Sequence, residues 1–515
     1  MIRSVGAVGG MTLVSRVTGL IRDIAFAQVL GSGAIADAFF VAFRIPNFLR
    51  RVFGEGAFSV AFVPVYSEYE SRYPPQQARA FLNLMAGRLG LILVALTAAG
   101  VLGAPALVSM LAPGFSADPA KYEATVSALR LTFPYLFFIS LVAMAGGILN
   151  TRERFAAPAA TPILLNLCLI ATVWLVVPRT TNIAIALGGG VLIAGVVQLA
   201  FQFPFLWQVR RVPRPRLRAT TQDERVGGEG VSQVFRLMLP AVFGVSIAQI
   251  NLLVNTVLAS FLVTGSVSWL YYSDRLMEFP LGVFGIALAT VILPTLSRQV
   301  ASSEQTAYSR TLDWALRLVF LVALPATAAL AILAFPLMVT LFHYGQFSAA
   351  DASMASKSLI AFALGLTGFI LVKVLAPGFY ARKDTRTPVI IGAIAMMVNA
   401  LAAVSLAFTL GHVGLALATS LAGIVNAALL YIRLVSKTGF QPGDGWPAFL
   451  ARVSLATLIM SALLGFGVAG DLTWLSHSVS KRILLLGFWV VAGGAVYLGS
   501  LYLLGLKVHR FVERP

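Results

Sequence analysis

Charged side chains stand inside segments that are otherwise apolar enough to cross a membrane. The segment 6–30 carries Arg16, Arg22 and Asp23, and about 100° of rotation per residue places its polar side chains within one arc. An ionisable group at membrane depth costs about 2.5–3.5 kcal/mol on insertion scales, so such groups normally face a cavity and serve a function. Arginine is preferred over lysine where phosphate is held through two hydrogen bonds. The pattern therefore predicts a site for an anionic, phosphate-bearing ligand.

Two further segments add to this predicted site. The segment 35–66 places Asp37, Arg44 and Asn47 on one face, and the segment 267–297 carries an arginine and a glutamate one turn apart. Structural ion pairing is the alternative, of Arg22 with Asp23 or Asp37 and of Arg275 with Glu278. Arginines outnumber acids across the three segments, so pairing cannot neutralise the site. The predicted ligand-binding residues are Arg16, Arg22, Asp23, Asp37, Arg44, Asn47, Arg50, Arg275 and Glu278; the inward orientation of Arg50 over Arg51 stays open.

The composition excludes a set of soluble domains. The 515 residues are 58% hydrophobic and 11% charged, whereas soluble proteins have about 25% charged residues. The net charge of +18 fits the lysines and arginines that gather in the inner loops of membrane proteins, and we expect no nucleic-acid partner. One cysteine and four scattered histidines predict no metal site or cofactor. No serine or cysteine nucleophile has a plausible histidine partner beside it in the sequence, so we expect no enzyme activity.

Apolar stretches predict an all-α polytopic membrane protein with 14 spans. They cover 6–30, 35–66, 88–111, 124–149, 158–178, 183–207, 232–263, 267–297, 314–342, 354–380, 388–409, 413–435, 447–469 and 482–505. Lysine and arginine concentrate in every second loop, which predicts that both termini are cytoplasmic. The longest loop, about 208–231, is rich in arginine and proline and is typical of a linker.

An internal repeat divides the predicted spans into two groups of six. The motif Gly114-Phe-Ser-Ala-Asp118 recurs about 230 residues later as Gly345-Gln-Phe-Ser-Ala-Ala-Asp351, and three further matches follow in the same order. Two lobes related by an axis along the membrane normal are typical of transporters. The predicted parts are a first lobe (1–212), a linker (213–230), a second lobe (231–437) and two C-terminal helices (438–515).

Several sequence runs resemble the MurJ (MviN) lipid II flippases of the MOP exporter superfamily. They are SRVTGLIRD (15–23), DAFFVAF (37–43), PNFLRR (46–51), EGAF (55–58), YYSDRLMEFP (271–280) and VKVLAPGFY (372–380). The resemblance covers nearly the whole chain. It implies that the charges at Arg16, Arg22, Asp37, Arg50 and Arg275 are functionally important, and that Asp23, Asn47 and Glu278 belong to the same motifs.

The resemblance also implies a bacterial inner-membrane protein that moves lipid II, the undecaprenyl-pyrophosphate-linked peptidoglycan precursor, to the periplasmic leaflet by alternating access. The arginines are expected to bind the pyrophosphate, and the C-terminal helices to hold the lipid tail. We expect a monomer in contact with membrane lipids and with cell-wall synthesis proteins, coupled to the membrane potential or an ion. The alternatives are a flippase for another polyprenyl-pyrophosphate oligosaccharide, a drug exporter, and a membrane-embedded glycosyltransferase or ligase.

Overall fold

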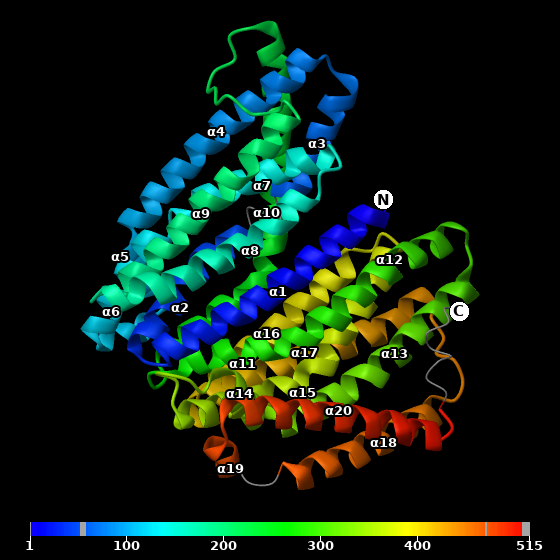
Figure 1. The fold of residues 1–515 in the computed structure, drawn as a ribbon. Helices are drawn as coiled ribbons and strands as arrows, with labels where there is room; N and C mark the ends of the chain where they lie inside the picture. The colour runs from blue at the N-terminus through cyan, green and yellow to red at the C-terminus, as the bar shows by residue number, and fades with distance from the viewer. Residues whose placement is uncertain (1, 52–57, 469–470, 507–515) are drawn as a thin grey trace. The chain divides into compact units, whose positions relative to one another are not determined.

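The described part of the chain is built from helices. The computed structural model describes residues 2–51, 58–468 and 471–506 (Figure 1), and every regular element in these ranges is helical, as predicted. Residues 52–57, which contain part of the repeat and of the family motifs, and the basic residues after 506 lie outside the described ranges.

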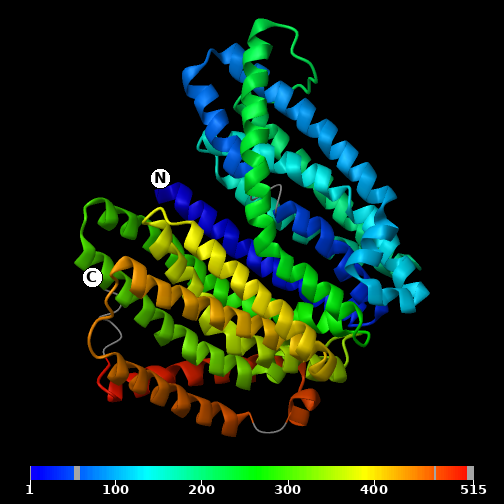
Figure 2. The same cartoon turned by 180° about the vertical axis from the view of Figure 1, so that it is seen from behind.

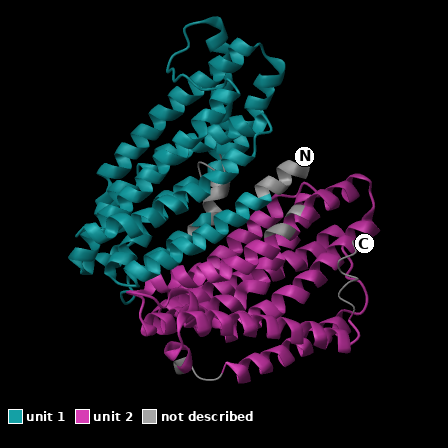
Figure 3. Ribbon diagram, viewed as in Figure 1, with its two compact units in different colours: residues 1–264 teal, residues 265–515 magenta. Residues whose placement is uncertain are grey.

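The chain forms two compact units, residues 1–264 and 265–515 (Figure 3). Unit 1 contains α1 (Ile2–Leu30), α2 (Ala34–Leu49), α3 (Phe58–Arg72), α4 (Pro75–Leu102), α5 (Ala104–Leu111), α6 (Pro119–Thr132), α7 (Tyr135–Thr151), α8 (Ala156–Ala171), α9 (Ile183–Gln208) and α10 (Gln222–Ser260), with the short η2 (Pro113–Ala117), η3 (Thr172–Val176) and η4 (Val177–Arg179). In it α1 packs against α8, α2 against α6, and the long α10 against α3 and α4 (Figure 2).

Unit 2 is arranged around α15. It contains α11 (Ser266–Pro280), η5 (Leu281–Gly285), α12 (Ile286–Ala301), α13 (Gln305–Ile332), α14 (Ala334–Phe342), α15 (Ala349–Tyr380), α16 (Arg386–Leu410), α17 (His412–Thr438), α18 (Trp446–Gly467), α19 (Asp471–Ser476) and α20 (Val479–Leu503). Helices α11, α13 and α17 pack against α15, and α18 pairs with α20.

Glycines allow α15 and α17 to approach closely. A Cβ atom built on Gly365 would lie 2.6 Å from the Cα of Ser420, and one on Gly368 would lie 2.9 Å from the backbone of Gly423. The Ser420 hydroxyl donates to the Ala361 carbonyl oxygen at 2.7 Å. Small residues at this spacing let helices in a membrane pack backbone to backbone, which fixes the centre of unit 2.

The segments matched by the sequence repeat have the same order of elements. Helices α4 and α5 contain 28 and 8 residues, and α13 and α14 contain 28 and 9. The aspartates of the matched motifs both act at the start of the next helix: Asp118 accepts from the Lys121 backbone, and Asp351 forms a capping box with Ser348. The repeated motif thus marks a helix start in each unit.

The predicted linker is shorter than the sequence indicated. Helix α10 begins at Gln222, inside the predicted range 213–230, because Thr221 and Glu224 form a capping box. Ahead of it, the backbone of Arg214 and Arg216 donates to Asn83 of α4 at 2.7 and 2.9 Å. The basic, glycine-containing sequence suggested a loop, but a strong N-terminal cap starts the helix early.

Ten helical segments in the described ranges are long and apolar enough to cross a membrane, and they coincide with ten of the predicted spans. The remaining predicted spans correspond to α1, α2 with α3, α10, and α11 with α12. All the predicted ligand-binding residues lie in α1, α2 and α11 or directly after α2. The charged side chains of the predicted site therefore belong to three helices.

Candidate functional site

Arg22 is held between α1 and α8 in unit 1. Its guanidinium donates to the Asp23 carboxylate at 2.7 and 3.0 Å and to the Asn166 side-chain oxygen at 3.0 Å. Asn166 donates in turn to the Ser15 carbonyl oxygen and to the Thr18 hydroxyl. Arg22 and Asp23 are only 7% and 2% exposed, so the structure contains one of the predicted pairings as a buried, hydrogen-bonded ion pair.

Asp37 pairs with Lys121, a residue that the prediction of the site did not include. The Lys121 ammonium lies 2.8 Å from the Asp37 carboxylate, and the two side chains are 4% and 1% exposed. The same ammonium lies 4.1 Å from the centre of the Phe115 ring. Lys121 belongs to the first turn of α6. The sequence offers one indication of its importance: Lys121 is one of the few basic residues in the set of alternate loops that is otherwise poor in lysine and arginine.

The remaining candidates of unit 1 have different surroundings. Arg44 donates to the Thr256 hydroxyl of α10 at 2.7 Å, and Arg50 donates to the Asn47 side chain at 2.9 Å. Arg16 is half-buried, and no hydrogen bond or ion pair joins its side chain to the described part of the chain. A ligand can therefore bind its guanidinium without first breaking a bond to the residues that the structure describes.

Arg275 of α11 is the basic candidate in unit 2. It donates to the Glu278 carboxylate at 3.0 Å, as the spacing predicted, and its guanidinium carbon lies 5.0 Å from the centre of the Tyr271 ring. The pair is partly exposed, with 27% and 39% of the two side chains accessible. A partly exposed pair is screened by water, so a phosphate of higher charge can compete for this arginine more readily than for a fully buried one.

Glu70 joins three elements at one end of unit 1. Its carboxylate accepts hydrogen bonds from Arg211 at 2.6 and 3.2 Å, from Arg152 and from the Tyr66 hydroxyl. Burial alone raises the pKa of Glu70, but the hydrogen bonds from Arg211 and Tyr66 outweigh it and hold the pKa below its ordinary value. The carboxylate therefore stays ionised and ties α3 to the end of α7 and to the segment after α9.

Because of Glu70, we expect the free energy of unfolding to decrease as the pH is lowered. Since the pKa of Glu70 is lower in the folded chain, its contribution is complete above the unfolded pKa of about 4.3 and is lost as the pH falls through the folded value. Glu70→Gln should remove this part of the acid dependence and destabilise the protein by about 1–3 kcal/mol at neutral pH. Thermal unfolding in detergent from pH 3 to 7 measures both effects. Glu229→Gln, at an exposed glutamate of the same unit, is the control. Identical pH profiles for wild type and Glu70→Gln would show that Glu70 does not contribute to the acid dependence.

Folding creates one serine–histidine pair that the sequence did not show. The Ser358 hydroxyl lies 2.6 Å from Nδ1 of His412, whose ring packs edge-on against Trp269. Ser358 has no exposed surface and His412 is 6% exposed, so a substrate cannot reach this hydroxyl. Within the described ranges, no group of three or more histidine, cysteine and acidic residues could hold a metal ion.

The sequence comparisons identify the family of this chain. The profile of the family described as "Lipid II flippase MurJ" matches residues 26–485. A protein of Vibrio cholerae serotype O1, described as "Probable lipid II flippase MurJ", is 44% identical over 508 residues, which cover 97% of this chain and 95% of that protein.

The comparisons with solved structures give the same result. A structure described as "Lipid II flippase MurJ, inward closed conformation" is similar with a TM-score of 0.78 and 27% identity, over 96% of this chain and 99% of the other. An inward-facing MATE family transporter of the MOP superfamily shares the fold, with a TM-score of 0.69 and 14% identity over 82% of this chain and 94% of the other. From the profile, the relative and the MurJ structure together, we conclude that this chain belongs to the lipid II flippase MurJ family.

Proposed function

We propose that this chain flips lipid II from the cytoplasmic to the periplasmic leaflet of the bacterial inner membrane. Membership of the MurJ family supports the substrate class. The observation that carries the proposal is the placement of charge: the predicted ligand-binding residues lie on or directly after α1, α2 and α11, which correspond to predicted membrane spans. Placing ionisable groups at membrane depth costs free energy. Transport of a polar, charged substrate across the bilayer would explain why the chain has them there.

The arginines are proposed to bind the pyrophosphate. Arg16 has no hydrogen bond or ion pair with the described part of the chain, and Arg275 forms a partly exposed ion pair with Glu278. A guanidinium offers a planar set of donors that matches two phosphate oxygens at once. Arg22, held in place by Asp23 and Asn166, would present its charge with little loss of side-chain entropy.

The rest of the proposed transport scheme rests on the sequence pattern and on membership of the family. Both termini are proposed to be cytoplasmic, and two lobes are proposed to alternate in access while the lipid tail lies along α18 and α20. The inside-negative membrane potential acts on each charge with about 2.3 kcal/mol per 100 mV. This force would help the empty, arginine-rich site to return to the cytoplasm-facing state. We further propose that the protein works as a monomer and meets the enzymes that use its product.

A leaflet-accessibility assay tests the proposal directly. Spheroplasts of a strain depleted of its own flippase should expose lipid II to an externally added lipid II-degrading enzyme only when this chain is expressed. Failure to expose lipid II, together with exposure of another polyprenyl-pyrophosphate saccharide, would change the substrate. Turnover of a lipid-linked substrate by the purified chain would instead indicate a transferase.

Arg275→Ala should reduce flipping about 10- to 100-fold, because a charge-assisted hydrogen bond contributes about 1.5–3 kcal/mol. Insertion should be unaffected, since the arginine is partly exposed. The same assay measures the loss, with membrane abundance followed by immunoblot. Arg298→Ala, an exposed arginine at the end of α12, is the matched control and should leave flipping unchanged. Wild-type flipping by Arg275→Ala would remove this residue from the site.

A further inference from the structure

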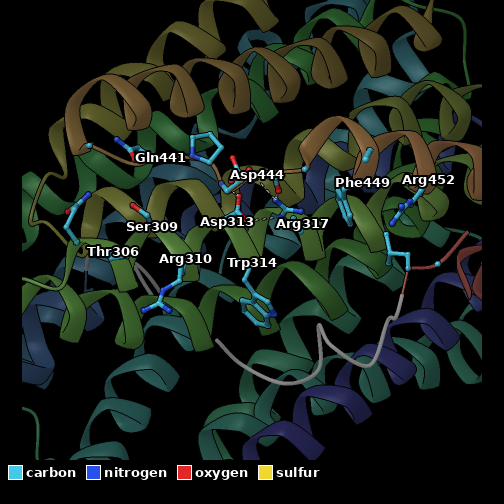
Figure 4. A pocket seen from close by; sticks show the side chains of 18 residues that line it. Thr306, Ser309, Arg310, Asp313, Trp314, Arg317, Gln441, Asp444, Phe449 and Arg452 are labelled. Carbon is cyan, nitrogen blue, oxygen red and sulfur yellow. Dashed lines mark hydrogen bonds and ion pairs between the residues drawn. The ribbon is translucent and has the colours of Figure 1, made fainter.

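A large pocket in unit 2 lies apart from the predicted ligand-binding residues. It has a volume of about 970 Å³ and is formed by the first turns of α13 and α18, the connecting segment 439–445 and the chain just after α20. Figure 4 shows that arginines from two helices line it, with Arg310 and Arg317 on α13 and Arg452 on α18. None of these arginines belongs to the predicted lipid II site.

Arg317 is fixed in the wall of this pocket. It donates to Asp313 at 2.7 Å and to the Asp444 carbonyl oxygen at 2.7 Å, and it stacks over Trp446 at 5.0 Å. Asp313 also accepts from the Gly443 backbone at 2.8 Å and from the Trp446 ring nitrogen at 2.6 Å. The wall is therefore a built structure that holds segment 439–445 against α13.

Two other arginines of the pocket take no part in the hydrogen bonds around Asp313 and Arg317. The side chains of Arg310 and Arg452 are exposed, and neither forms a hydrogen bond or ion pair with the described part of the chain. Figure 4 shows them to either side of Arg317. The lining contains three arginines and two aspartates, Asp313 and Asp444. Since Arg317 pairs with Asp313, the pocket keeps an excess of one positive charge, with the donors of Arg310 and Arg452 facing an anion.

The helix ends place the pocket at the depth of lipid headgroups. Three candidate spans begin or end around it, because α13 starts at Gln305, α18 starts at Trp446 and α20 ends at Leu503. Trp314 lines the pocket and Trp446 packs against Arg317 in its wall, and tryptophan is enriched at the boundary between membrane and water. A ligand in this pocket would therefore have its polar part at the membrane surface.

The neighbouring helix offers an apolar surface to a lipid tail. In the most apolar window of α20 only 11% of the residues are buried, and Tyr502 and Leu503, beside the pocket residues Gly505 and Leu506, are 76% and 85% exposed. A soluble anion would use only the arginines, whereas an anionic lipid would use both the arginines and this apolar face. Basic pockets at the ends of spans are known to bind acidic headgroups.

We propose that the pocket between α13, α18 and segment 439–445 binds the phosphate of an acidic glycerophospholipid, with Arg310 and Arg452 as the phosphate-binding residues. The acyl chains lie along the exposed face of α20. This site shares α20 with the proposed lipid II tail but uses different arginines, and binding of its ligand, a resident membrane lipid, requires no flipping.

Lipid binding to the purified full-length chain tests the proposal. The chain in a neutral detergent is titrated with phosphatidylglycerol, phosphatidylcholine or inorganic phosphate, and bound lipid is counted by native mass spectrometry. We expect at least a tenfold preference for phosphatidylglycerol. Arg310→Gln with Arg452→Gln should weaken it about fivefold per arginine, while phosphatidylcholine binding should not change. Arg298→Gln with Arg433→Gln, exposed arginines of the same unit outside the pocket, is the charge-matched control.

The outcomes separate the sources of phosphate. Binding of phosphatidylglycerol and phosphatidylcholine with equal affinity would overturn the proposal, as would an equal loss in the control variant. Competition by inorganic phosphate at similar concentration would assign the pocket to a soluble anion instead. If the glutamine variant does not fold, Arg310→Lys with Arg452→Lys keeps the charge and should retain most of the preference; loss of the preference in that folded variant contradicts an electrostatic headgroup site. Flipping assays play no part, so the proposed transport function and this site can fail independently.

Discussion

Arg22→Ala should abolish lipid II flipping while the protein still reaches the membrane. The change removes a buried guanidinium that donates to Asp23 and Asn166 and that we propose to contact the pyrophosphate. Two charge-assisted hydrogen bonds from this guanidinium to the pyrophosphate would contribute about 1.5–3 kcal/mol each. Without them, flipping should fall about 100-fold or more. The leaflet-accessibility assay in a depleted strain measures the loss, and complementation of growth provides a second readout.

Two companion variants separate binding from structure. Arg22→Lys keeps the charge but loses the planar arrangement of donors, so we expect intermediate flipping. Asp23→Asn removes the charge of the partner and leaves the arginine in place, so it reports on how the buried pair is maintained. Membrane abundance must be compared in all three, since an unpaired Asp23 lowers stability. Full complementation by Arg22→Ala at normal abundance would remove this residue from the substrate site.

Lys121→Met should destabilise the protein by about 3–5 kcal/mol, because it leaves the buried Asp37 carboxylate without its lysine partner. Adding Asp37→Asn to Lys121→Met should recover part of the loss, since the buried carboxylate that has lost its lysine is then replaced by a neutral amide. Thermal unfolding of the four proteins in detergent gives the coupling energy between the two side chains. Flipping by the double variant then shows whether transport needs the charges themselves or only the packing of α2 against α6.

Lys357→Met is the matched control for this cycle. Lys357 is exposed on α15, and no hydrogen bond or ion pair joins its side chain to the described part of the chain, so its removal should change stability by less than about 0.5 kcal/mol. Strict additivity of Asp37→Asn and Lys121→Met would show that the 2.8 Å contact does not contribute to stability.

Local pairings were accessible to sequence reasoning because helix geometry alone brings the groups together. Arg22 and Asp23 are adjacent, and Arg275 and Glu278 are one turn apart, and both pairs are present in the structure. The helical composition and ten of the predicted spans follow from hydropathy in the same way. Helix α10 begins earlier than the hydropathy predicts, because the capping box of Thr221 and Glu224 starts the helix within a segment of loop-like composition.

Pairings between distant residues were not accessible. Lys121 lies 84 positions from Asp37, and Ser358 lies 54 positions from His412. The hydrogen bond from Arg22 to Asn166 joins residues 144 positions apart. Such contacts depend on which helix faces pack together, and apolar sequence of nearly uniform hydropathy contains little information about that choice.

The Glu70 carboxylate has a consequence for the order in which the chain is made. Its partner Arg211 follows 141 residues later, and ribosomes add about 5–20 residues per second, so the glutamate waits roughly 7–28 seconds for this arginine to be synthesised. During that interval the end of α3 is held without its main cation. Unit 1 therefore closes at this end only after α9 has been translated, and chaperones or the insertion machinery meet an unfinished bundle until then.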